Sequence, residues 1–207
     1  MPYQLITTDW VSMPSPEGVE YCRTDAPAQC ARTNASGIAM FPDLPARTQL
    51  VLSVRHDGDM DLLKHFVTPQ PATTMPRDPF VRLISHERWT RWANQAGVKL
   101  EPDKGHIWFF VLTSVSAKVE LRPTAGTRVY FRSMDELDPT LETSGPTGHG
   151  IVFNVPPGEY DAVFSAPGRR CQFGMETGWP GTTPDASRVT VKAGFISFPA
   201  FGVCLPE

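Results

Sequence analysis

Residues 143–160 read TSGPTGHGIVFNVPPGEY, and this stretch decides the fold of the second half of the chain. Thr143 leads into a glycine-containing turn, an apolar run follows from Gly150 to Val155, and a Pro-Pro-Gly turn ends at Gly158. Short runs rich in β-branched and aromatic residues, bounded by Gly and Pro, are typical of β-strands. The stretch therefore predicts a strand, a tight turn and a second strand that begins near Tyr160.

The first half repeats this order of residues. Residues 33–45 read TNASGIAMFPDLP, so that a Thr again precedes a glycine-containing turn, an apolar run and a Leu-Pro turn. The copy is less regular, because residues 46–48 read ART where the second half has a Pro-Gly turn. The repeat predicts two modules of similar architecture.

Short apolar runs separated by turn residues occupy most of the remaining chain. In the run Leu50–Val54 the residues Leu50, Leu52 and Val54 share one face by the period-two rule of a strand. The other predicted strands are Gly18–Cys22, Gly37–Phe41, Ile107–Leu112, Val129–Phe131, Tyr160–Phe164, Val189–Val191 and Ile196–Phe198. Many short strands with few helical stretches favour an all-β sandwich.

One helix is predicted between the halves, over about 80–96. Asp78-Pro79 offers a cap followed by proline at the first helical position, Ser85 offers a second cap, and Gly97 offers a left-handed terminator. Before the helix, residues 68–76 read TPQPATTMP, a composition typical of linkers. We therefore expect an N-terminal β-sandwich module over 1–70, a linker and helix over 71–103, and a C-terminal module over 104–207.

The predicted strand Ile107–Leu112 is apolar on both faces, because Trp108 alternates with Ile107 and Phe109. A two-layer sandwich buries only one face of a strand. We expect the helix to cover the second face with Trp89 and Trp92, which lie at helical spacing. The alternative is an exposed patch that binds a partner or ligand.

Charge and hydropathy exclude several classes of partner. The net charge is −3, and the basic residues are scattered rather than clustered, so neither nucleic acid nor an anionic membrane is an expected partner. The longest apolar run is far shorter than the roughly 20 residues of a membrane-spanning helix. The first eleven residues lack the pattern of a signal peptide, which leaves a cytosolic protein or one whose leader was removed.

The four cysteines help to choose between these compartments. Cys22 and Cys30 lie in the first half, Cys171 and Cys204 lie in the second, and none forms a metal-type Cys-x-x-Cys pair. We predict one disulfide in each half, which implies an oxidising compartment. The alternative is four buried thiols in a cytosolic protein.

The block that ends in Pro156-Pro157-Gly158-Glu159-Tyr160 resembles transthyretin-like modules of the carboxypeptidase regulatory-like and collagen-adhesin B-type families. The resemblance implies two transthyretin-like β-sandwich modules joined by a short helix. The whole arrangement also looks like secreted or lipid-anchored proteins of Gram-negative bacteria. It implies a secreted, periplasmic or cell-surface protein and is silent on activity, because one fold hosts many functions.

The densest group of chemically active residues lies between His56 and His65. His56, Asp59 and His65 are the candidates for a catalytic or metal-dependent site, whereas the spacing of the aspartates does not fit a calcium loop. The alternative is a solvated, charged loop after the strand Leu50–Val54. We assign no metal site and no cofactor.

A second candidate is Trp179, in the glycine-rich stretch 174–181 near Cys171, where an exposed aromatic ring suits a sugar or another ligand. We expect a secreted binding or structural module whose loops act on a β-sandwich scaffold. Its partner is an unidentified protein, carbohydrate or small molecule. The rival hypothesis is an extracellular hydrolase or metal-dependent enzyme that uses the segment His56 to His65.

Overall fold

The computed structural model describes residues 3–9, 16–41, 44–45, 48–68, 81–112, 116–173, 179–180, 182–199 and 202–206. Within these residues the fold is all-β with one short helix, as predicted. The elements in chain order are β1 (Tyr3–Asp9), β2 (Glu20–Arg23), β3 (Cys30–Arg32), β4 (Ile38–Phe41), β5 (Gln49–Arg55), β6 (Leu62–Val67), β7 (Val81–Leu83), α1 (His86–Gln95), β8 (Gly105–Leu112), β9 (Lys118–Arg122), β10 (Thr127–Ser133), β11 (Glu136–Asp138), β12 (His149–Val155), β13 (Gly158–Ser165), β14 (Arg169–Phe173), β15 (Trp179–Pro180), β16 (Ala186–Val191), β17 (Ile196–Phe198) and β18 (Gly202–Pro206).

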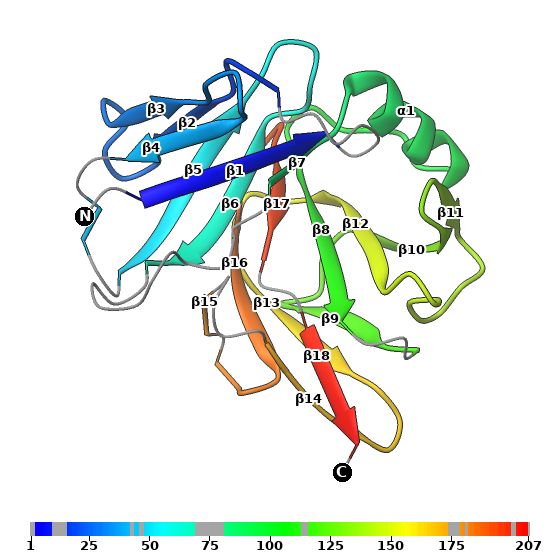
Figure 1. The fold of residues 1–207 in the computed structure, drawn as a ribbon. Helices are drawn as coiled ribbons and strands as arrows, with labels where there is room; N and C mark the ends of the chain where they lie inside the picture. Colours follow the sequence, from blue (N-terminus) through cyan, green and yellow to red (C-terminus); the bar gives the residue numbers. More distant parts are fainter. Residues whose placement is uncertain are drawn as a thin grey trace.

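The described strands form three sheets. A three-stranded sheet has the order β4-β1-β7, and a four-stranded sheet has the order β15-β16-β13-β9. The eleven-stranded sheet runs β11-β10-β12-β8-β17-β6-β5-β2-β3, with β18 joining β14 to β8. Strand β17 pairs in parallel with both β6 and β8 and lies between them in Figure 1. One sheet therefore continues from the first half of the chain into the second.

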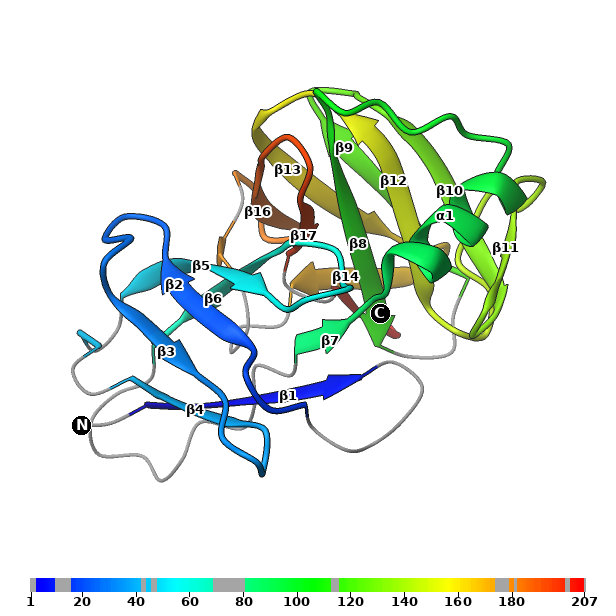
Figure 2. The same ribbon diagram turned by 90° about the horizontal axis from the view of Figure 1, so that it is seen from above.

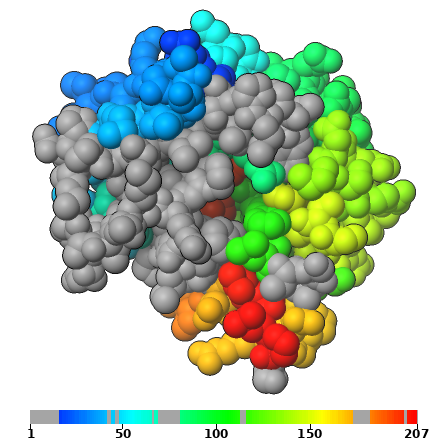
Figure 3. All heavy atoms as spheres, in the orientation of Figure 1, coloured from blue at the N-terminus to red at the C-terminus, as the bar shows by residue number. Residues whose placement is uncertain are grey.

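Each half forms two layers around apolar side chains. In the first half, β4-β1-β7 lies beneath β2, β5 and β6 (Figure 2), and Tyr21, Phe41 and Leu52 are buried between the layers. In the second half, the four-stranded sheet faces β8, β10 and β12, with Phe109 and Phe164 in the core. The space-filling view shows residues of the first half in blue at one end of the molecule and β18 in red at the other (Figure 3).

Every strand predicted from the sequence is present, and the predicted faces are confirmed. Leu50, Leu52 and Val54 lie in the core of the first half, whereas Val51 belongs to a separate buried cluster with Leu63 on the other face of the sheet. The structure adds strands that the sequence did not predict. One is β6, so the charged loop after β5 ends at Asp61 instead of extending to His65.

The helix begins later than predicted. Residues 81–83 form β7, which pairs in parallel with β1, and Val81 and Leu83 are buried while Arg82 between them is exposed. This alternation is that of a strand. Ser85 is the N-cap, its side chain accepting a hydrogen bond from the backbone N–H of Arg88, and Gly97 ends the helix with a φ of 67°. No helix in the described residues is long and apolar enough to cross a membrane.

A polar turn precedes β4 in the first copy of the repeat and is held by side chains. The side-chain oxygen of Asn34 accepts hydrogen bonds from the backbone N–H groups of Ser36 and Ile38. Thr33 is buried, and its hydroxyl accepts from Val19 N and donates to Pro16 O. These bonds fix the turn through side chains, because Asn and Thr readily replace backbone partners in this way.

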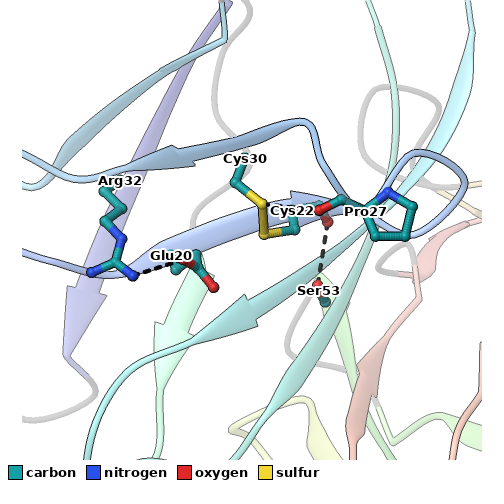
Figure 4. Close-up of a disulfide and its surroundings, with 6 residues drawn as sticks. All are labelled: Glu20, Cys22, Pro27, Cys30, Arg32 and Ser53. Atoms are coloured by element: carbon teal, nitrogen blue, oxygen red, sulfur yellow. Dashed lines mark hydrogen bonds and ion pairs between the residues drawn. A yellow bond between two sulfur atoms is a disulfide. The ribbon is translucent and has the colours of Figure 1, made fainter.

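Both predicted disulfides are present, and they differ in exposure. Cys22–Cys30 joins β2 to the edge strand β3, where Cys30 is exposed (Figure 4). Cys171–Cys204 joins β14 to β18 and is buried in the core of the second half. The first disulfide therefore secures an exposed sheet edge, and the second secures the C-terminal strand.

Strand β8 is covered on both faces, and the predicted cover by the helix is confirmed. Ile107, Phe109 and Val111 point into the sandwich core, whereas Trp108 lies in the core shared with α1. The ring of Trp92 contacts Trp108 at a centroid distance of 5.7 Å and an interplanar angle of 71°. The indole N–H of Trp92 also donates to Asp135 at 3.0 Å, which ties the helix to the turn between β10 and β11.

We predict that Trp92→Ala lowers the free energy of unfolding by about 3–5 kcal/mol, because it opens a cavity against Trp108 and leaves Asp135 without its indole donor. Thr90→Ala on the exposed side of the same helix is the control and should change it by less than about 0.5 kcal/mol. Urea denaturation of both variants measures the difference. A loss below about 1 kcal/mol for Trp92→Ala would contradict the packing described here.

The division into modules 1–70 and 104–207 stays a prediction, since β17 pairs with strands of both halves. We expect a fragment of residues 78–207 to melt cooperatively and one of 104–207 to aggregate, because the shorter fragment exposes Trp108 and Phe131. Thermal melting in oxidising buffer distinguishes them. If neither fragment folds, the halves share one core and the division is wrong.

Candidate ligand pocket

The first two candidate residues lie close together on the loop between β5 and β6. His56 Nδ1 and Asp59 Oδ2 are 2.7 Å apart, and the side chains are 30% and 16% exposed. The backbone of Asp59 also bridges to Ser85, the N-cap of α1. The pair therefore closes the loop and connects it to the start of the helix.

His65 lies in β6, away from that loop, with its side chain completely buried. Its Nε2 accepts a hydrogen bond from Thr190 N at 2.9 Å, so the proton of the neutral ring is on Nδ1, which faces Phe198 O at 3.2 Å. Burial, opposed by the hydrogen bond to Phe198 O and assisted by the charge of Lys64, lowers the pKa of His65 to about 4. The imidazole thus joins β6 of the first half to β16 and β17 of the second.

The structure does not bring His65 to His56 and Asp59. His65 pairs with Val51, five residues along β5 from His56, which is about 16 Å at the usual rise of a strand. Among the described residues no group of three or more His, Cys, Asp or Glu side chains could hold a metal ion. The three candidate residues therefore form two separate structural contacts, the pair His56–Asp59 on the loop and the hydrogen bonds of His65 in β6.

Two further histidines, His106 of β8 and His149 of β12, are buried within aromatic clusters. His106 packs against Trp89 at 5.0 Å and accepts a hydrogen bond from Asn154 N, and burial lowers its pKa to about 4. His149 stacks on Phe110 at 4.3 Å, and burial, assisted by the charge of Arg82, lowers its pKa to about 3. Both rings are neutral near pH 7.

A shallow depression of about 560 Å³ lies where the two halves meet, and we call it the junction pocket. Its walls combine hydroxyl groups, two guanidinium groups and two carboxylates with a larger share of carbon surface. The first half supplies β5 and the end of β2, and the second half supplies β9, β13, β16 and the segment before β16 (Figure 1). It is lined by Thr24, Val51, Arg122, Glu159, Tyr160, Asp161, Thr182, Arg188 and Thr190.

The floor of the junction pocket is a row of charged residues across three strands. Asp161 of β13 pairs with Arg122 of β9 on one side and with Arg188 of β16 on the other. Directly paired residues share one face of a sheet, so the three side chains form a line. The central strand β13 pairs with β16 along one edge and with β9 along the other, which holds the row on a rigid surface.

Several polar groups of the junction pocket are uncommitted. With the described residues, the side chains of Arg122, Glu159 and Thr190 make no hydrogen bond or ion pair. Asp161 is buried, and its Oδ2 accepts hydrogen bonds from both the backbone N–H and the hydroxyl of Thr182. Among the described residues, Oδ1 of Asp161 has one charged partner, Arg188 Nε, which lies 3.9 Å away and beyond hydrogen-bonding distance. A bound ligand could therefore engage several donors and acceptors at once.

The backbone of Trp179 pairs with that of Arg188, one of the residues that line the pocket. Trp179 belongs to the short strand β15, and its side chain lies outside the described residues. The sequence placed Trp179 in a long loop. The structure instead positions residues 179–180 at the edge of the four-stranded sheet that forms the floor of the pocket.

Sequence reasoning missed the charged row itself. Arg122, Asp161 and Arg188 each occupy an outward position in an alternating strand, which by itself indicates only a solvated face. Their juxtaposition depends on the pairing of β9, β13 and β16. The one available signal was the alternation of Asp161 with Tyr160 and Ala162, which correctly places it on the outer face.

Comparisons with known proteins give no family for this chain. No protein-family profile and no curated protein matches it. Among solved structures, the Bacillus anthracis TIE protein is 12% identical with a TM-score of 0.29, and the match covers 99% of this chain and 34% of that one. The minor pilin GBS52 of Streptococcus agalactiae is 13% identical with a TM-score of 0.29, covering 100% and 97%. TM-scores this low do not establish a common fold.

Because three histidines are buried and neutral, we predict that the folded protein becomes less stable in acid. His65, His106 and His149 are neutral in the folded protein, and their pKa values lie below the ordinary 6.5, so the unfolded chain binds more protons between about pH 6.5 and 4. The free energy of unfolding should therefore fall as pH decreases through this window, by up to about 3 kcal/mol per histidine. Urea denaturation at a series of pH values measures the slope.

The variant His65→Gln tests the assignment. Glutamine can accept from Thr190 N and donate to Phe198 O but does not titrate, so the slope should become shallower. His86→Gln is the control, because His86 is exposed at the start of α1 and should leave the slope unchanged. A free energy of unfolding that stays constant from pH 6.5 to 4 would refute the prediction.

Proposed function

We propose that this protein is a secreted or cell-surface binding module, built of transthyretin-like β-sandwiches, that holds a polar ligand in the junction pocket without catalysis. The observation that carries the proposal is the set of uncommitted hydrogen-bonding groups on the rigid floor of the pocket, chiefly Arg122, Glu159 and the Oδ1 atom of Asp161. Ligand sites commonly combine a preformed concave surface with a few placed polar groups.

Secretion is supported by the two disulfides. No described cysteine is free, and Cys22–Cys30 is exposed on an edge hairpin, where a reducing cytosol would act on it. Both bridges join directly opposed residues of neighbouring strands. They stabilise the sandwich whether or not a ligand is bound. Such disulfides suit a scaffold exposed to an oxidising environment.

The enzymatic rival has less support from the geometry. His56 and Asp59 form a pair at 2.7 Å, but His65 is committed to Thr190 and Phe198 at the junction of the halves. A hydrolase built on these three residues would need them within reach of one substrate. The same histidine instead fits a structural role.

We expect a ligand of the junction pocket to raise the melting temperature by about 5 °C or more near saturation, since binding to the folded state stabilises it by mass action. The double variant Arg122→Ala/Glu159→Gln should melt at nearly the same temperature without ligand and lose the increase. Thermal shift screening against saccharides, peptides and small polar metabolites provides the measurement.

A turnover assay on the same compounds separates binding from catalysis. Saturable turnover that is lost on His56→Ala would contradict the proposal and favour the enzyme. If no compound of any class binds in a way that depends on Arg122 and Glu159, the junction pocket is not a ligand site.

A further inference from the structure

The charge of the junction pocket restricts the class of its ligand. Arg122 and Arg188 are balanced by Glu159 and Asp161, so the lining is neutral overall. The attraction that a strongly anionic ligand gains from the two guanidinium groups is offset by repulsion from the two carboxylates, and the reverse holds for a strongly cationic ligand, so the lining gives neither a net attraction. The balance favours an uncharged ligand that can both donate and accept hydrogen bonds.

The lining mixes carbon and polar surface. Only Val51 and Tyr160 are apolar or aromatic residues, and both are mostly covered, with exposed fractions of 7% each. Much of the carbon surface therefore belongs to threonine methyl groups and to the aliphatic stems of the charged residues. A ligand that presents C–H groups beside hydroxyl groups fits this mixed surface better than a purely apolar ligand.

The position of the pocket argues against an extended peptide. A peptide that adds to a sheet needs a free strand edge for its backbone. The floor here is the face of a sheet, because β13 pairs with β16 along one edge and with β9 along the other. A peptide at this floor could use only its side chains, for which the pocket offers no apolar recesses.

We propose that the junction pocket binds a neutral saccharide, an inference that rests on the proposed binding function. Sugar hydroxyls both donate and accept, and neighbouring hydroxyls on a ring can bridge the two oxygens of a carboxylate or the two nitrogens of a guanidinium group. Glu159 and Arg122 offer such planar groups, and Asp161 offers Oδ1. A volume of about 560 Å³ is in the range of pockets that hold compact ligands of roughly two sugar rings.

The location of the site at the junction has a consequence for stability. Thr24 and Val51 come from the first half and the charged row comes from the second, so a bound saccharide contacts both. Thr190, also in the lining, donates a hydrogen bond from its backbone N–H to Nε2 of the buried His65. Binding therefore stabilises the arrangement of the two halves in addition to filling the pocket.

The test uses the full chain and an array of neutral and charged glycans, followed by calorimetric titration of the neutral glycan that binds best. We expect neutral glycans to bind and acidic or amino glycans of the same length to bind less. Glu159→Gln and Arg122→Ala should each weaken binding about tenfold, the usual cost of losing a hydrogen-bonded charged group. Trp179→Ala tests whether the residue paired with Arg188 adds an aromatic contact.

Glu142→Gln is the matched control. Glu142 lies between β11 and β12, is also exposed, makes no hydrogen bond or ion pair with the described residues, and is outside the pocket. Its replacement removes the same charge and should leave the affinity within about twofold of the wild type, which excludes a general effect of net charge. Melting temperatures of all variants without ligand show that each is folded.

Three outcomes would overturn the proposal. If no glycan binds while peptides or metabolites raise the melting temperature through Arg122 and Glu159, the ligand class is wrong and the binding function stands. If glycans bind but Glu159→Gln, Arg122→Ala and Glu142→Gln all bind as well as the wild type, the saccharide site lies elsewhere. Absence of binding by every class of compound would refute the binding function as well.

Discussion

Strand β8 must bury both of its faces, and much of the architecture follows from this constraint. Ile107, Phe109 and Val111 require one apolar layer, and Trp108 on the opposite face requires another. The four-stranded sheet provides the first layer and α1 provides the second. A strand covered on two sides cannot lie at the surface, so β8 becomes the centre around which the second half is assembled.

The same strand also determines how the halves meet. Because β8 is central, β17 can pair with it on one edge and with β6 of the first half on the other. Two side chains strengthen this connection. His65 joins β6 to β16 and β17, and Phe195 is buried in a cluster with Val51 and Leu63 while Arg55 and Lys192 lie over its ring. The connection is formed by backbone pairing, a buried imidazole and an aromatic anchor.

Two groups of titratable residues lie in different environments. The buried histidines, His65, His106 and His149, are held neutral by desolvation and serve packing and hydrogen bonding inside the protein. The charged groups of the junction pocket lie on the outer face of a sheet, where Arg122 and Glu159 make no hydrogen bond or ion pair with the described residues. Of the three residues that the sequence offered as a reactive group, His65 is enclosed, which separates it from His56 and Asp59 on their loop.

The sequence by itself determined the all-β class, the strands with strong alternation, the two disulfides and the cover of Trp108 by the helix. Each of these depends on local periodicity or on residues of unambiguous chemistry, such as the alternation of Leu50, Leu52 and Val54 or the pairing of cysteines within each half. Tertiary structure alone decided the start of the helix, since Val81 and Leu83 form a strand only because β1 is beside them. It also decided the junction pocket, because Arg122, Asp161 and Arg188 are brought into one row by strand pairing across more than sixty residues of chain. Pairing between distant strands is not encoded in any local pattern, so a site made by it is invisible in the sequence.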